Sequence, residues 1–266
     1  MVRRIGFIGA GRIVEAMLTA LGPAIGYGNI SVWNRTPARG QRLAKEFGIA
    51  LESDLASLIA ASDWLLLAVK PHAVAEVLPV LAATCPPEKL LVSMAAGIPV
   101  DSLRAWFPQP PQVVRIMPNL PLSIGSGTTA VCAHASVPLE VVEEVRALFA
   151  TAGIARIVEE RLFDTVTALS GSGPAFAFLF IESLADGAVL NGMSRELAYE
   201  FAAQTVLGAA RIILGSDRHP GELKDIVASP AGTTMAGIHS LERKAFRSIV
   251  MDAVDAAAKR SRELGH

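Results

Sequence analysis

The pattern of apolar residues changes once along this 266-residue chain, near Glu159. Before that point, short apolar runs alternate with amphipathic stretches, which is the pattern of a mostly parallel, doubly wound sheet. The predicted strands are Arg4–Ile8, Ile30–Trp33, Trp64–Ala68, Leu90–Ser93, Val113–Ile116, Thr128–Cys132 and Ile154–Val158. The predicted helices between the early strands are Arg12–Leu21, Pro37–Phe47, Asp54–Ala61, His72–Ala83 and Asp101–Trp106.

After Glu159 the sequence predicts helices and almost no strands. Long patterns rich in Ala, Leu and Val predict helices over Ser172–Leu190, Ser194–Leu214 and Leu241–Leu264. We therefore expect an α/β domain over residues 1–158 and an all-helical domain over residues 159–266. The helices are too apolar for a lone bundle, so part of their surface is expected to pack against another subunit.

Composition excludes several classes of protein. Hydrophobic residues make up 52% of the chain and charged residues 18%, with a formal net charge of −1, so nothing favours nucleic acid or an anionic membrane surface. No stretch approaches the roughly 20 uncharged apolar residues of a membrane span. Cys85 and Cys132 have neither metal-site nor disulfide-framework spacing, and we find no metal-binding constellation. We expect a soluble, cytoplasmic protein.

A glycine turn follows the first predicted strand. Arg4–Ile8 leads into Gly9-Ala-Gly11, which opens a helix. In dinucleotide-binding folds the first glycine permits the tight turn, the second lets the pyrophosphate approach the backbone, and the helix N-terminus attracts the phosphates. The third fingerprint position is Val14, a bulkier residue that should push the helix slightly off the strand. The predicted cofactor-binding residues here are Ile8, Gly9, Ala10, Gly11, Arg12 and Ile13.

The end of the second predicted strand indicates which dinucleotide binds. An NAD enzyme usually places Asp or Glu there, to hold the ribose hydroxyls. This chain has Asn34-Arg35-Thr36 instead. Arg35 can pair with a 2′-phosphate and Thr36 can hydrogen-bond to it, so NADPH is favoured and NADH is expected to bind more weakly.

Two further segments follow predicted strands, at the edge where open sheets bind ligands. They are Ala68-Val69-Lys70-Pro71 and Met94-Ala95-Ala96-Gly97. Their small residues leave room for the ribose and nicotinamide, although each segment alone is equally compatible with an ordinary loop.

Several motifs distributed along nearly the whole chain resemble those of the pyrroline-5-carboxylate reductases. The specific ones are Thr167-Ala-Leu-Ser-Gly-Ser-Gly-Pro-Ala175 and Ser229-Pro-Ala-Gly-Thr-Thr234. Others are Phe7-Ile-Gly-Ala-Gly11, Ala68-Val-Lys-Pro71, Ala95-Ala-Gly97, Arg115-Ile-Met-Pro-Asn119, Phe246-Arg247 and Arg260-Ser-Arg-Glu-Leu264.

The resemblance implies an NADP-binding Rossmann domain followed by a helical domain that binds substrate and dimerises. It implies that two subunits interleave their helical domains, and it allows dimers to assemble further. The implied reaction is reduction of 1-pyrroline-5-carboxylate to L-proline, the last step of proline biosynthesis.

The resemblance also implies roles for residues of the substrate loop, Ser229–Thr234. Thr234 matches the residue that hydrogen-bonds the substrate near its ring nitrogen, and the amides of Gly232, Thr233 and Thr234 match those that hold the carboxylate. Glu160 matches an acidic residue near the substrate, and Asn119 joins the expected cofactor set. The chain departs from the family pattern at Arg12, Ile13, Val14, Leu120, Phe176 and Ala231, which bears on cofactor affinity more than on reaction type.

The chemistry of a cyclic imine explains why no His–carboxylate or Lys–carboxylate pair is evident. An iminium carbon accepts hydride readily, so the protein mainly has to position the reactants. Two alternatives stay open: an NADPH-dependent reductase of another cyclic imine or of a hydroxy acid, and a non-catalytic NADPH-binding protein. The intact Gly232-Thr233-Thr234 element is evidence against the second.

Overall fold

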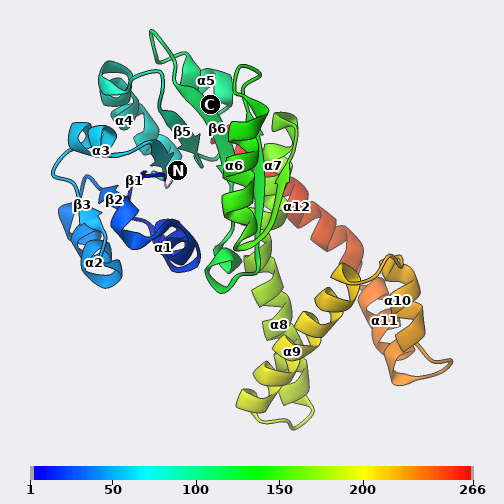
Figure 1. The fold of residues 1–266 in the computed structure, drawn as a ribbon. Coiled ribbons are helices and arrows are strands. Elements are labelled where there is room, and N and C mark those ends of the chain that lie inside the picture. The colour runs from blue at the N-terminus through cyan, green and yellow to red at the C-terminus, as the bar shows by residue number, and fades with distance from the viewer. Residues whose placement is uncertain (1–2, 265–266) are drawn as a thin grey trace. The chain divides into compact units, whose positions relative to one another are not determined.

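The computed structural model of the chain, shown in Figure 1, describes residues 3–264. The chain divides into two compact units. Unit 1 runs to Gly171 and takes in the chain again from Ala256, whereas unit 2 is Ser172–Asp255. The predicted domain limits at residues 1 and 266 lie outside the described residues.

Unit 1 contains one eight-stranded sheet of order β3-β2-β1-β4-β5-β6-β7-β8. Its neighbouring strands are parallel except for the antiparallel pair β6 and β7, which confirms the predicted mostly parallel sheet. The short strand β3 was not predicted, because two exposed residues carry no periodicity. The bounds are β1 (Ile5–Ile8), β2 (Ile30–Trp33), β3 (Ala50–Leu51), β4 (Trp64–Leu67), β5 (Leu90–Ser93), β6 (Gln112–Met117), β7 (Gly127–Ala133) and β8 (Gly153–Ile157).

Helices cover both faces of this sheet, which confirms the doubly wound class. On β4, Trp64 and Leu66 pack into one apolar cluster with α1 (Arg12–Ile25), α2 (Pro37–Phe47) and α6 (Leu139–Ala150). Leu65 and Leu67 pack into the other, with α3 (Leu55–Ala61), α4 (Pro71–Thr84) and α5 (Val100–Arg104). Alternation along a strand therefore supplies two cores, one on each side.

Three short helical turns follow the sheet before unit 1 ends at Gly171. They are the 3₁₀ turn η3 (Glu160–Leu162), α7 (Phe163–Val166) and the π-helical turn η4 (Thr167–Gly171). Near the other end of unit 1, the Ser261 hydroxyl lies 2.6 Å from Asp164 Oδ1. The C-terminal part of the last helix thus packs with the turns that precede unit 2.

Unit 2 is all helical, as predicted. It consists of α8 (Gly173–Leu190), α9 (Arg195–Leu214), α10 (Pro220–Val227), α11 (Thr233–Arg243) and the first part of α12 (Phe246–Glu263). The single predicted helix over Leu241–Leu264 is wrong, because the chain breaks between α11 and α12. Ala245 adopts a left-handed φ of 56° there, which ends α11 and starts α12 in a new direction.

Unit 2 buries very little of its apolar surface within the single chain. Its one buried cluster consists of Ala185, Ala198 and Ala202. By length and composition, Glu160–Leu190 and Arg195–Leu214 could each cross a membrane, which is weak evidence because helices of soluble proteins pass the same test. Exposed large side chains of unit 2 include Phe178, Leu179, Leu190, Phe201, Ile212, Leu214, Val227 and Ile249.

The two cysteines of the chain lie buried in unit 1 as free thiols. Burial raises the pKa of Cys85 to about 11 and that of Cys132 to about 12. Both side chains therefore stay protonated at neutral pH and serve as small apolar groups of the second cluster.

Candidate active site

Gly9 ends β1 in a conformation that only glycine adopts freely. Its φ is +115°, and a Cβ at this position would lie 2.7 Å from the Ala68 carbonyl oxygen of the neighbouring strand connection. Its amide donates to the Trp33 carbonyl at 2.8 Å. The first glycine of the predicted fingerprint is therefore fixed both by its turn and by close approach to β4.

The N-terminus of α1 offers donors and open space next to this turn. Gly11 caps the helix with no side-chain hydrogen bond, and a Cβ on Gly11 would meet no atom within 4 Å. The amides of Arg12 and Ile13 belong to the first turn, where a helix provides no acceptor of its own. The residues present therefore fit a pyrophosphate, which needs amide donors, positive helix dipole and room.

Asn34 connects the glycine turn to the end of β2. Its Oδ1 accepts from the Ala10 amide at 3.1 Å, and its Nδ2 donates to the Thr36 carbonyl at 2.8 Å. The structure thus brings Ala10, Asn34 and Thr36 together. Their arrangement holds the segment that the sequence predicts for the 2′-phosphate.

Arg35 is exposed and forms an ion pair with Glu76 of α4. Sequence reasoning did not single out Glu76, because the two residues lie 41 positions apart. The pair joins the segment after β2 to α4. A phosphate reaching Arg35 would compete with the Glu76 carboxylate for it.

The predicted segments after β4 and β5 lie at the same edge as the glycine turn. The Ala68 amide donates to the Ile8 carbonyl at 2.9 Å, and the Met94 amide donates to the Leu67 carbonyl at 3.2 Å. Lys70 caps α4, whose first residue is Pro71, and Gly97 turns the next segment with a φ of +76°. The carboxyl ends of β1, β4 and β5 therefore present these loops side by side.

Asn119 uses both ends of its side chain within unit 1. Its Oδ1 accepts from the Thr128 amide at 2.8 Å, and its Nδ2 donates to the Ser170 carbonyl at 3.0 Å. The residue is 8% exposed. The structure thus joins it to β7 and to the π-helical turn.

The predicted substrate loop joins α10 to α11 in unit 2. Ala231 has a left-handed φ of 56°, and the Gly232 amide then donates to the Ser229 carbonyl at 3.0 Å. A Cβ on Gly232 would lie 2.3 Å from Ser229 Oγ and 3.1 Å from the Ser229 carbonyl oxygen, so a larger residue here would displace the Ser229 side chain. Gly232 caps α11 with no side-chain hydrogen bond, and Thr233 and Thr234 are its first residues. Ser229 and Thr233 are exposed, whereas Thr234 is partly buried.

Glu160 lies in unit 1, at the start of η3. Its Oε1 accepts from Arg115 Nη1 at 3.0 Å and from the Val100 amide at 2.7 Å. Arg115 belongs to a motif noted in the sequence, but sequence reasoning gave it no role. A charged residue within the apolar run Val113–Ile116 was the signal that could have identified it.

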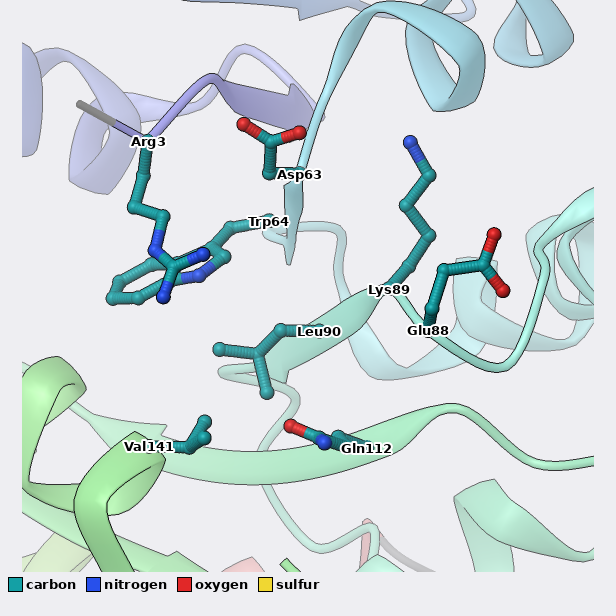
Figure 2. Close-up of a pocket in the computed structure, with 8 residues that line it drawn as sticks. All are labelled: Arg3, Asp63, Trp64, Glu88, Lys89, Leu90, Gln112 and Val141. Atoms are coloured by element: carbon teal, nitrogen blue, oxygen red, sulfur yellow. The ribbon is translucent and has the colours of Figure 1, made fainter. Parts of the chain in front are cut away.

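A pocket of about 240 Å³ lies at the opposite edge of the sheet, where strands β4, β5 and β6 begin. Figure 2 shows the residues that line it. Two of its charged groups form ion pairs: Arg3 pairs with Glu144 and Asp63 with Arg4. Lys89 Nζ donates to the Ser62 carbonyl. This pocket therefore lacks the free amides and glycines of the carboxyl edge. Among residues 3–264, no group of three or more His, Cys, Asp or Glu side chains could hold a metal ion.

A doubly wound sheet with a glycine turn, an uncapped helix and an arginine at its carboxyl edge defines a nicotinamide-dinucleotide oxidoreductase. Residues 4–97 match the family model described as NADP oxidoreductase, coenzyme F420-dependent, and residues 160–264 match that for pyrroline-5-carboxylate reductase dimerisation. The chain belongs to the pyrroline-5-carboxylate reductase family. The second match indicates that the chain associates with itself.

Full-length relatives carry this assignment. The chain is 42% identical to the pyrroline-5-carboxylate reductase of Methanosarcina acetivorans, over 99% of this chain and 98% of that protein. It is 37% identical to the enzyme of Escherichia coli, over 99% of both chains. A crystal structure of the Plasmodium falciparum pyrroline carboxylate reductase with NADP bound has a TM-score of 0.90 at 32% identity, covering 99% of this chain and 98% of that one.

Proposed function

We propose that this chain reduces 1-pyrroline-5-carboxylate to L-proline with NADPH, as the last step of proline biosynthesis. The observation that carries the proposal is similarity to enzymes of this name over 99% of the chain. The substrate loop retains its glycine cap and paired threonines at the start of α11.

For the cofactor, we assign the pyrophosphate to the Gly9-Ala10-Gly11 turn, where the amides of Arg12 and Ile13 at the start of α1 donate to it. Arg35 and Thr36 recognise the 2′-phosphate, with Asn34 fixing their backbone, and NADH binds more weakly for lack of that phosphate. Ala68–Pro71 and Met94–Gly97 border the ribose and nicotinamide. Bound NADPH supplies the hydride.

For the substrate, we assign the carboxylate to the amides of Thr233 and Thr234, which follow the Gly232 cap at the start of α11, where the helix dipole favours an anion. The Thr234 hydroxyl hydrogen-bonds near the ring nitrogen, and Ser229 shapes the loop by packing over Gly232. The substrate reaches the enzyme as an iminium ion near neutral pH, so the residues orient it and no strong acid is required.

We also propose that two subunits interleave their helical domains, and that such dimers can assemble into larger oligomers in the cytoplasm. The exposed apolar side chains of α8 and α9 support this, because a subunit interface would cover them. We place the functional boundary between an NADP-binding domain, 1–158, and a substrate and dimerisation domain, 159–266. The match of residues 160–264 to a dimerisation model supports it.

The test measures substrate-dependent loss of NADPH absorbance by the purified protein and identifies the product. Proline is the expected product, and tight NADPH binding without turnover would reject the proposal. Thr234→Ala should lower kcat about 100-fold or more while leaving the Kd for NADPH nearly unchanged. Ser240→Ala, at an exposed position on the same helix, is the control and should behave as the wild type.

A further inference from the structure

Arg115 is a cation inside an apolar layer of unit 1. It occupies the face of β6 that also presents Val113 and Met117, and it is only 3% exposed. Its guanidinium carbon lies 4.7 Å from the ring centroid of Phe163, which is itself buried. Burying a charged side chain costs free energy of folding. The contacts of the Arg115 guanidinium therefore indicate which structural role offsets that cost.

One carboxylate oxygen of Glu160 joins its own turn, η3, to two other elements. Glu160 Oε1 accepts from Arg115 Nη1 of β6 and from the amide of Val100, the first residue of α5. Glu160 itself begins the turns that lead toward unit 2. The buried Nε of Arg115 has no hydrogen-bond partner within the described chain, so a single ion pair and the Phe163 ring hold this side chain in place.

The contact with Val100 holds the start of α5, three residues beyond the Met94–Gly97 loop. Arg115 lies directly opposite Ser93, the last residue of β5, where that loop begins. The near end is held because the Met94 amide donates to Leu67 and the Ala95 amide approaches Ser93 Oγ at 3.3 Å. Between these two points, Gly97 turns the chain with a positive φ. The loop is thus held at its start by the sheet, and the chain three residues beyond its end is held by Glu160.

We propose that Arg115 and Glu160 are positioning residues, which hold the Met94–Gly97 loop through the Val100 amide so that it fits the nicotinamide half of NADPH. This rests on the proposed function. Glu160 acts as a fixed hydrogen-bond acceptor in this arrangement and exchanges no proton with the substrate. Arg115 keeps its oxygen directed at Val100.

Two substitutions at Glu160 distinguish a role as hydrogen-bond acceptor from a role as proton donor to the substrate. Glu160→Gln keeps Oε1 as an acceptor for both donors and removes the charge. We expect its kcat, and the shape of its pH profile, to stay within about threefold of the wild type. Glu160→Ala removes the acceptor, so the Kd for NADPH should rise about tenfold or more while kcat falls less.

Measurements without turnover complete the test. Hydrogen exchange of cofactor-free protein should become faster over residues 94–104 in Glu160→Ala and stay unchanged in Glu160→Gln. Glu159→Ala is the matched control, because its exposed carboxylate pairs only locally with Arg161. Arg115→Met combined with Glu160→Gln removes the buried charge together with its partner and should restore thermal stability lost in Glu160→Ala.

Two results would overturn the proposal. One is a Glu160→Gln variant as inactive as Glu160→Ala, with the Kd for NADPH unchanged in both, because that pattern belongs to proton transfer. The other is a Glu160→Ala variant whose NADPH affinity and loop exchange equal those of Glu159→Ala. Failure of the proposed function is distinguishable, because the wild type itself would then bind NADPH without reducing the substrate.

Discussion

The two units of this chain solve the burial of apolar surface differently. Unit 1 encloses two apolar clusters, one on each face of its sheet, and residues such as Phe7, Leu18 and Leu65 are fully buried in it. Unit 2 encloses three alanines. Its larger apolar residues, such as Phe178 at 61% and Leu179 at 64%, are exposed in the single chain.

This contrast indicates that only unit 1 encloses a large apolar core within the single chain. A fully buried Leu or Phe stabilises a fold by about 1.5–3 kcal/mol relative to an exposed one, and unit 2 obtains almost none of this within one chain. The match of residues 160–264 to a dimerisation model indicates that a second copy covers this surface. Stability of unit 2 is then inseparable from the concentration of the protein.

The largest expected effect comes from a charge in the exposed apolar face of unit 2. Leu179→Asp places a carboxylate from each subunit into the proposed interface, and we expect the dimer Kd to rise about a thousandfold or more, with loss of activity. Light scattering on a size-exclusion column measures the change. Val80→Asp, at a 42% exposed position on α4 of unit 1, is the control and should remain dimeric. A dimeric, active Leu179→Asp would place the interface elsewhere.

A pair of leucine truncations sharpens the same comparison. Leu18→Ala in the core of unit 1 should cost about 3 kcal/mol of unfolding free energy at any protein concentration, because the cavity lies within one chain. Leu179→Ala should cost a similar amount only in the dimer. Urea denaturation at several protein concentrations measures both. If the losses of unfolding free energy in Leu18→Ala and Leu179→Ala depended equally on protein concentration, the two units would not differ in how they bury apolar surface.

The backbone supplies a smaller contrast, on the order of 1 kcal/mol. Left-handed φ angles in unit 1 fall on glycines such as Gly125, whereas unit 2 places Ala231 and Ala245 there. A Cβ on Gly125 would meet no atom within 4 Å, so Gly125→Ala should destabilise by about 1 kcal/mol through strain alone. Ala245→Gly should stabilise by somewhat less, because glycine also gains freedom in the unfolded chain. Thermal melts of both variants check the signs, and a destabilised Ala245→Gly would contradict the strain.

The smallest effect concerns an exposed ion pair of unit 1. Hydrogen bonds from Arg4 lower the pKa of Asp63 from 3.8 to about 2. A carboxylate whose pKa is lower in the folded state than in the unfolded state stabilises the fold at pH values above its unfolded-state pKa. This contribution is lost as the pH falls through the folded-state pKa. The wild type should therefore have a larger unfolding free energy than Asp63→Asn, by an amount that is constant near neutral pH and well below about 1 kcal/mol. This difference should shrink between pH 3.8 and about 2. Urea midpoints across that range test it, and an advantage that grows toward acid pH would contradict the sign.

Periodicity was enough to predict the layers and class of both units, because alternation and helical repeats directly report which faces are buried. The break at Ala245 was not predictable this way, since alanine is the strongest helix former and rarely adopts the left-handed conformation that it has here. The helix α6 was also not predicted, although its sequence is amphipathic.

The candidate site likewise contains features that the local sequence predicts and features that it does not. The Gly9 turn was evident because glycine, strand and helix start follow one another in the sequence. The partners Glu76 and Arg115 were not, because their significance depends on residues 41 and 45 positions away. Pairings across a fold are set by topology, and one sequence does not reveal them.

The protonated, buried state of Cys85 and Cys132 has a practical consequence for studying assembly. Alkylating and maleimide reagents attack thiolates, so the natural protein presents a chemically quiet background. A single cysteine introduced at an exposed position such as Val80 would carry a fluorophore or spin label without prior removal of the native thiols. Distances between two labelled copies could then be followed in an otherwise unaltered enzyme.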